Sequence, residues 1–184
     1  MGTKKSIEIT ALDATPFVAL EAGNVKGKMR VFADTVACAT GDLDDNDIVV
    51  MAEIPSNAKV TSIMLYNDDL DSNGSPAIAT DVGIYAGGTK FTDTDGSATA
   101  YAAEAVIDRD AYASAITTLQ AANTAGIECA YEARNINTIA NYIWEDAGLS
   151  SDPKVPLRIA LTIETVAATQ AAGDISVVVT YVVD

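Results

Sequence analysis

Two stretches near the end of the chain alternate large apolar residues with smaller or polar ones, and this alternation constrains the fold more than any other feature of the sequence. The first holds Leu157, Ile159, Leu161 and Ile163, and the second holds Ile175, Val177, Val179, Tyr181 and Val183. Alternate positions of a β-strand face the same side of a sheet, so each stretch predicts a half-buried strand. The Ala-rich connection 165–174 between them contains Gly173-Asp174. We therefore predict a closing antiparallel hairpin over residues 156–184.

Several earlier segments also have strand character. Apolar residues alternate with polar ones at 7–9 and at 28–33, where Met29, Val31 and Ala33 are predicted to share one face. Residues 47–54, 60–66 and 80–86 are rich in Val, Ile and Tyr, which suit a pleated surface. Turn-forming residues follow these segments, such as Pro55-Ser56-Asn57 and Gly87-Gly88.

From residue 108 the apolar period changes to that of a helix. Asp108 and Asp110 favour a helix start, and further apolar residues follow at helical spacing: Tyr112, Ala115, Ile116 and Leu119. A second helical set lies between a predicted N-cap at Asn135 and a predicted helix end at Gly148: Ile136, Ile139, Ala140 and Ile143. The chain is therefore predicted to be an all-β dominated, antiparallel, jelly-roll-like β-sandwich. It forms a single domain over 1–184 with a helical or irregular insertion near 108–148.

Composition narrows the function classes. The chain has 184 residues, which fits one domain, and its 26 acidic and 11 basic residues give a net charge of −15. Binding to nucleic acid depends on Lys and Arg neutralising phosphates, so a nucleic-acid partner is not expected. Neither a signal peptide nor a run of about 18 apolar residues is found, so no membrane association is expected. Hydrophobic residues make up 49% but aromatic residues only 6%, which predicts a core of Ile, Val and Leu.

The chain contains no histidine. This removes the usual general base, the Ser-His and Cys-His nucleophile pairs and the commonest transition-metal ligand, so we do not expect an enzyme. Cys38 and Cys129 lack metal-ligand spacing and sit among small or apolar residues. They are predicted to be buried free thiols, unless the fold brings them together as a disulfide.

One loop resembles part of a calcium site. Asp69, Asp71 and Asn73 precede Gly74, as oxygen ligands at alternate positions do in the first half of a calcium loop. The position expected to carry a bidentate Glu is Thr80, so Asp81 would have to complete the site with a different geometry. The alternative is an acidic turn between strands, which the same residue types favour. No other cofactor is expected.

Three segments together give the chain a family resemblance. Ile54-Pro55 to Val60 is similar to a turn that precedes a long strand in small β-proteins of phage virions, and 81–85 and 144–153, with the last strand ending at Asp184, complete the pattern. The chain thereby resembles the decoration (cement) or head-fibre proteins of tailed phages. This resemblance implies a virion structural protein on the outer capsid surface that is made in the host cytoplasm. It implies the major capsid protein as partner and a homo-oligomer, with a trimer favoured.

Two points stay open at this stage. The apolar residues Ile136, Ile139 and Ile143 either cover an open end of the sandwich or form a subunit interface. The alternative function is a calcium-dependent adhesion or ligand-binding β-sandwich, which would use Asp69, Asp71, Asn73 and Asp81 as ligands.

Overall fold

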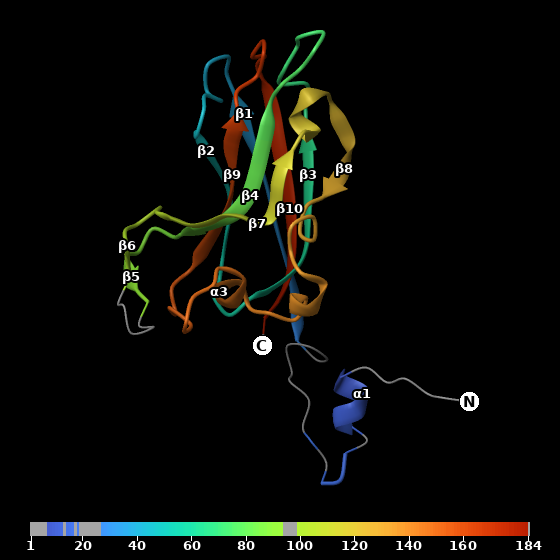
Figure 1. Cartoon of the computed structure of the whole chain (residues 1–184), viewed down its shortest axis with the longest axis vertical. Coiled ribbons are helices and arrows are strands. Elements are labelled where there is room, and N and C mark those ends of the chain that lie inside the picture. The colour runs from blue at the N-terminus through green and yellow to red at the C-terminus, as the bar shows by residue number, and fades with distance from the viewer. Residues whose placement is uncertain (1–6, 13, 17, 19–26, 94–98, 184) are drawn as a thin grey trace, which may run out of the picture.

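The computed structural model describes residues 7–12, 14–16, 18, 27–93 and 99–183. Two four-stranded antiparallel sheets pack face to face (Figure 1), which confirms the predicted all-β sandwich. Sheet A has the strand order β1 (Lys28–Cys38), β10 (Gly173–Val183), β3 (Lys59–Asn67) and β8 (Asn123–Glu128). Sheet B has the order β2 (Ile48–Ile54), β9 (Leu157–Thr165), β4 (Ala79–Ala86) and β7 (Val106–Ile116).

The eight strands form a jelly roll. The first strand pairs with the last, β1 with β10, and the inner pairs follow in order as β2 with β9, β3 with β8 and β4 with β7. The pairs β10–β3 and β9–β4 then join these four hairpin-like pairs into two sheets. This is the wrapped, double-sheet arrangement of jelly-roll proteins.

The predicted closing hairpin is wrong, although both of its strands exist. β9 pairs with β2 and β4 in sheet B, whereas β10 pairs with β1 and β3 in sheet A. Each strand is central in its sheet and turns its alternating apolar residues towards the shared core. The alternation therefore identified the strands, but it carries no information about which strands pair, because a hairpin and a crossing between sheets bury the same positions.

The predicted helix after residue 108 is also wrong, because 106–116 forms β7. Its register against β4 shifts three times, so β7 is strongly bulged. Bulges insert extra residues between inward-facing positions, and the spacing of Tyr112, Ile116 and Leu119 then imitates a helix. Between 129 and 148 the helical structure is limited to the 3₁₀ turn η2 (Ile136–Thr138) and the one-turn helix α3 (Ile143–Asp146).

The predicted boundaries of that second segment hold. The Asn135 side chain accepts a hydrogen bond from the Asn137 N–H and so caps η2. Gly148 follows α3 with φ of 69°, the left-handed conformation that ends many helices. Both predictions depend only on the side chain or backbone conformation of one residue. They are therefore correct although the long helix predicted between Asn135 and Gly148 does not form.

The remaining elements lie outside the two sheets. The N-terminal segment α1 (Ile7–Leu12) is a helix and not the predicted strand, and Figure 1 shows it beyond the end of the sandwich. β5 (Phe91–Thr92) and β6 (Ala100–Tyr101) form a short arm between β4 and β7, and the 3₁₀ turn η1 (Thr118–Gln120) precedes β8. Among the described residues, no helix has the length and apolar character needed to span a membrane.

The core lies between the sheets and consists mainly of Ile, Val and Leu, as predicted. Its fully buried members include Ile63 and Leu65 from sheet A and Ile84 and Ile159 from sheet B. Cys38 and Cys129 are buried free thiols, which confirms that prediction, and burial raises the pKa of the Cys129 thiol to about 12. Each thiol therefore packs as a small apolar group.

Candidate functional site

The predicted calcium loop is organised around Asp71, which is 1% exposed. Its carboxylate accepts backbone N–H hydrogen bonds from Ala77 at 2.6 Å and Ile78 at 3.1 Å, and from Ala168 and Thr169 at 2.9 Å each. The first two donors belong to the β3–β4 connection and the other two to the β9–β10 connection. Asp71 therefore ties two end loops together, and its oxygens face hydrogen-bond donors.

These hydrogen bonds determine the ionisation of Asp71. Burial alone would raise the pKa of its carboxyl, but the N–H groups of Ala77, Thr169, Ala168 and Ile78 together hold the pKa well below its ordinary value. The carboxylate is thus charged at neutral pH and is neutralised by backbone dipoles. A cation would have to displace those donors.

The other predicted ligands are engaged elsewhere. Asp81 is 2% exposed and binds Arg109, with 2.6 Å from its Oδ2 to the guanidinium, and it also accepts the Ala115 N–H. Asp69 accepts the Asp71 N–H and Asn73 accepts the Ser75 N–H, both as turn-forming side chains. Within the described ranges, no three His, Cys, Asp or Glu side chains are grouped to hold a metal ion. The hydrogen bonds of Asp69 and Asn73 are those of an acidic turn, and the calcium site stays a prediction.

The three predicted interface residues separate. Ile143 is fully buried in the core, so the hypothesis of an interface is wrong for this residue. Ile136 and Ile139 are 79% and 55% exposed. A single helix would have placed all three on one stripe, but the chain turns between η2 and α3 and points only Ile143 inwards. The segment that carries them lies at the end of the sandwich near the C-terminus, drawn orange in Figure 1.

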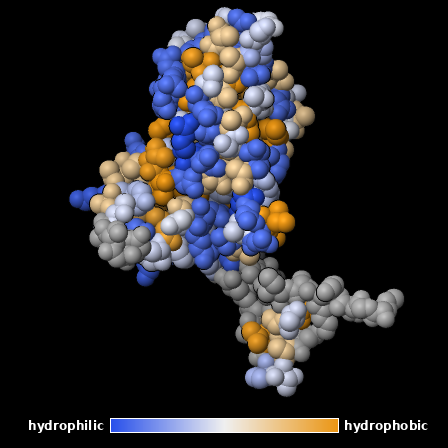
Figure 2. Space-filling model, viewed as in Figure 1, coloured by the Kyte–Doolittle hydropathy of each residue, from blue (hydrophilic) through white to orange (hydrophobic). Residues whose placement is uncertain are grey.

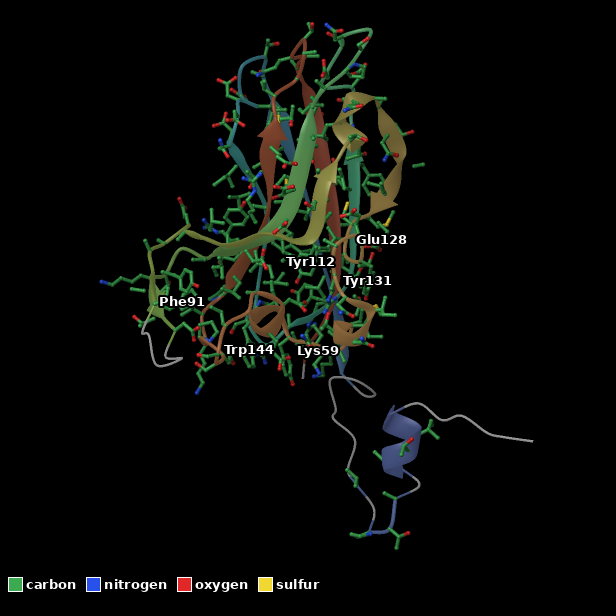
Figure 3. The ribbon with its side chains drawn as sticks, viewed as in Figure 1. Lys59, Phe91, Tyr112, Glu128, Tyr131 and Trp144 are labelled. Atoms are coloured by element: carbon green, nitrogen blue, oxygen red, sulfur yellow. The ribbon has the colours of Figure 1, made fainter. Side chains whose placement is uncertain are left out.

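A buried ion pair fixes that segment to the sandwich. The Arg134 guanidinium lies 2.8 Å from the Asp146 carboxylate, and both side chains are at most 3% exposed. Arg134 also donates to the carbonyls of Val60 and Thr138, and the rings of Tyr112 and Tyr131 flank it. Figure 3 shows both tyrosines at this end of the molecule.

Burial raises the pKa of the Asp146 carboxyl to about 6, although Arg134 and the Tyr112 hydroxyl act in the opposite direction. The cluster serves packing and attachment. Both terminal nitrogens of Arg134 bind protein oxygens, which makes the buried charge tolerable, while its buried Nε has no hydrogen-bond partner.

The most unusual surface is the outward face of sheet A. Paired residues of an antiparallel sheet share a face, so the pairings of β1, β10 and β3 define four rows across it. We call this surface the uncharged face; on these three strands it consists of Met29, Val31, Ala33, Thr35, Ser176, Val178, Thr180, Val182, Ser62, Met64 and Tyr66. Met29 is 68% and Val31 is 59% exposed. Large apolar side chains are thus left in solvent on the edge strand of a regular sheet.

Charged residues border the uncharged face: Lys59 and Glu128 are held by the protein, and Asp174 is exposed in the next row, opposite Ala37. Lys59 is 4% exposed and its ammonium lies 4.2 Å from the centre of the Tyr142 ring. Glu128 accepts hydrogen bonds from the Ser62 hydroxyl and the Ile63 N–H. Figure 3 labels Lys59 and Glu128 at different heights along the sandwich. In a chain of net charge −15, four rows without a free charge are a local exception.

The sequence of β1 contains a signal for this face. Alternation identified Met29, Val31 and Ala33 as one face of a strand, and the structure confirms that they share it. The opposite face of β1 places Phe32 and Val36 against the core. Because both faces of β1 carry large apolar residues, one of them had to be either covered by another chain or exposed.

The outward face of sheet B differs in character. Arg158 bridges Glu53 and Glu104 there at 2.8 Å each, and Arg109 pairs with Asp81. In Figure 1, β4 and β7 of sheet B lie nearest the viewer, and Figure 2 shows hydrophilic residues over most of this side with groups of hydrophobic residues among them. The outward face of sheet B therefore carries paired charges, although Ile48 and Val50 on its edge strand β2 are also exposed, at 43% and 42%.

Comparison with known proteins gives a consistent fold. The chain is similar to a chain of the capsid of Ralstonia phage GP4, with a TM-score of 0.55 and 21% identity over 84% of this chain and 85% of that one. It is also similar to a chain of the capsid asymmetric unit of cyanophage Pam1, with a TM-score of 0.53 and 22% identity over the full length of both. No family model and no curated relative matches the sequence. At this level of identity, the likeness establishes a shared fold.

Proposed function

We propose that this chain is a structural protein of a tailed-phage virion that decorates the outer capsid surface. The observation that carries the proposal is the likeness of the whole jelly roll, over 84–100% of the chain, to chains from two phage capsids. The jelly-roll architecture is common in viral capsid proteins, although a fold alone does not specify a role. The resemblance of segments 54–60, 81–85 and 144–153 to phage decoration or head-fibre proteins points in the same direction.

The chemistry of the side chains is consistent with a non-enzymatic role. The buried charged groups that could have served catalysis or metal binding bind structural partners instead: Asp71 holds loops, Asp81 holds Arg109, and Asp146 holds Arg134. Histidine is absent from the chain. A strongly acidic surface keeps such a protein soluble and monodisperse before assembly.

The proposed partner is the major capsid protein, and the proposed assembly is a trimer, which would match local three-fold symmetry of a capsid. We assign the contact with the capsid to the end of the sandwich that carries Ile136 and Ile139. These residues are 79% and 55% exposed, and the buried Arg134–Asp146 pair fixes the segment behind them. Apolar side chains on a rigid support are typical anchors of a protein interface.

The experiment uses heads of a phage from which the gene for this chain has been deleted. Purified protein is added to the heads, and bound protein is quantified after sedimentation. The proposal predicts saturable binding, with Ile139→Glu weakening binding at least tenfold while the variant stays folded. Ile48→Glu is a matched control because Ile48 is also exposed, at 43%, but lies on sheet B. Absence of binding by the unaltered protein would contradict the proposal. Binding unaffected by Ile139→Glu would contradict the assigned contact.

A further inference from the structure

The uncharged face is a regular surface where large apolar residues are exposed and free charges are missing. We propose that it is the contact between copies of this chain. This inference rests on the proposed function in one respect: it assumes the proposed oligomer and identifies the surface that holds it together. It differs from the capsid contact, which we placed at Ile136 and Ile139.

The distribution of charge favours a second copy over a partner of opposite charge. Each copy carries a net charge of −15, so two copies repel unless they meet where acidic groups are missing. The rows that contain Val31 and Val178 meet this condition. A basic partner would gain most from the acidic surfaces instead, such as the loop that holds Asp42, Asp44 and Asp45.

The dimensions of the face suit the centre of an interface. The face has four rows on three strands. Because rows lie about 6.8 Å apart along the strands and strands lie about 4.8 Å apart, its flat area is roughly 400 Å². A standard interface buries about 800 Å² per partner, of which the centre is apolar and the rim polar. The central rows contain Val31, Ala33 and Val178, and the row with Thr35, Ser176 and Tyr66 supplies hydroxyl groups towards one edge. Thr35 and Ser176 already bind each other at 2.8 Å.

The geometry favours packing of the uncharged face onto the surface of a neighbouring copy over pairing of strand edges. β1 is an edge strand of eleven residues, a length at which edge pairing would be a hazard. Its other side, however, carries the exposed charged residues Lys28, Arg30 and Asp34, which oppose the close approach of another strand. The outward side, with Met29 and Val31, has no such protection. The second copy is therefore expected to pack onto the sheet rather than extend it.

Gly126 keeps the face flat on its β8 side. A Cβ at this position would lie 2.6 Å from the Tyr66 ring and 2.9 Å from the Met64 Cε, so both side chains lie directly over the glycine backbone. A residue with a side chain would lift Tyr66 and Met64 out of the plane. The glycine therefore allows a smooth surface where a partner can approach closely.

The test compares the solution mass of the full chain with that of single-residue variants by light scattering. The unaltered protein is expected to be oligomeric. Val31→Asp places a charge in a central row of the face, on the edge strand β1, and should raise the dissociation constant at least tenfold, giving the mass of one chain at micromolar concentration. Met29→Asp is a second variant at a more exposed position. Val50→Asp is the matched control, because Val50 is 42% exposed on β2, an edge strand of sheet B.

Salt provides an independent readout. Association of like-charged copies should strengthen when NaCl is raised from about 50 mM to about 500 mM, because screening weakens their repulsion. A monomeric unaltered protein, or oligomers that persist in folded Val31→Asp and Met29→Asp, would overturn the inference. Neither result would affect the proposed binding to the capsid, because binding of the protein to heads is measured separately, although a monomer would also contradict the proposed trimer. A Val31→Asp monomer that still sediments with heads would support both.

Discussion

Replacement of Asp71 by Ala should destabilise the protein far more than replacement of the neighbouring Asp69. Asp71 accepts four backbone hydrogen bonds at 2.6–3.1 Å from two different loops. A hydrogen bond to a charged acceptor contributes about 1.5–3 kcal/mol, and a buried donor that loses its acceptor is penalised further. If two of the four N–H groups find water in the variant, the other two still account for a loss of about 3–6 kcal/mol.

The assay is urea unfolding at pH 7, with Asp69→Ala as the control. Asp69 is exposed and accepts one hydrogen bond, at 3.1 Å, so its replacement should change the free energy of unfolding by about 1 kcal/mol or less. A loss below about 1 kcal/mol for Asp71→Ala would refute the reasoning, because the four contacts would then contribute nothing beyond an ordinary surface side chain.

The pH dependence gives the same prediction a second test. Because the pKa of Asp71 is lowered in the folded state, its contribution is complete above its unfolded pKa of about 3.9 and is lost as the pH falls further. The stability difference between the unaltered protein and Asp71→Asn should therefore shrink between pH 5 and pH 2. A calcium site would behave differently: calcium would raise the melting temperature, and Asp69→Ala and Asp71→Ala would both abolish the rise. We expect neither calcium nor chelator to shift it.

Three further outcomes are expected from contacts elsewhere in the molecule. Arg134→Ala leaves the Asp146 carboxylate buried without its cation and should lower the free energy of unfolding, measured in urea, by about 3–5 kcal/mol. Because the pKa of Asp146 is raised to about 6 in the folded state, the unaltered protein should lose stability as the pH rises from 4 to 7. Asp146→Asn should remove this loss. Ellman's reagent should label Cys38 and Cys129 slowly in the native protein and completely after denaturation, and fast native labelling would contradict their burial. Gly126→Val should lower the melting temperature by several degrees because of the φ of 80° and the clash with Tyr66, whereas Gly74→Ala, with open space around it, should have little effect.

Much of the fold could be predicted from the sequence because the alternation of apolar residues along a strand shows which of its residues face the core. The inward positions of β9 and β10, from Leu157 to Val179, were identified by alternation alone. The pairing of these strands could not be, since the order of strands depends on contacts between distant segments. The boundary signals at Asn135 and Gly148 were correct because they depend on the local backbone. The helix between them was wrong because bulges and turns reproduce helical spacing over short distances.

The candidate site was predicted only in part. Ile136 and Ile139 are exposed as an interface requires, but Ile143 is in the core. Asp71 was predicted as a calcium ligand, which stays a prediction. Its hydrogen-bond partners in the β9–β10 connection are almost a hundred residues away, and sequence spacing could not show them. The sequence could not show that Met29 and Val31 face solvent, because both faces of β1 are apolar. In the structure, Phe32 and Val36 on the opposite face pack against the core.

The most direct test of the central claim is a cryo-electron microscopy difference map between virions that contain this chain and virions that lack it. We predict difference density on the outer capsid surface, into which the jelly roll fits with the end carrying Ile136 and Ile139 towards the shell and sheet A towards a neighbouring copy. Difference density restricted to the tail or to the interior, or no difference at all, would contradict the proposed function.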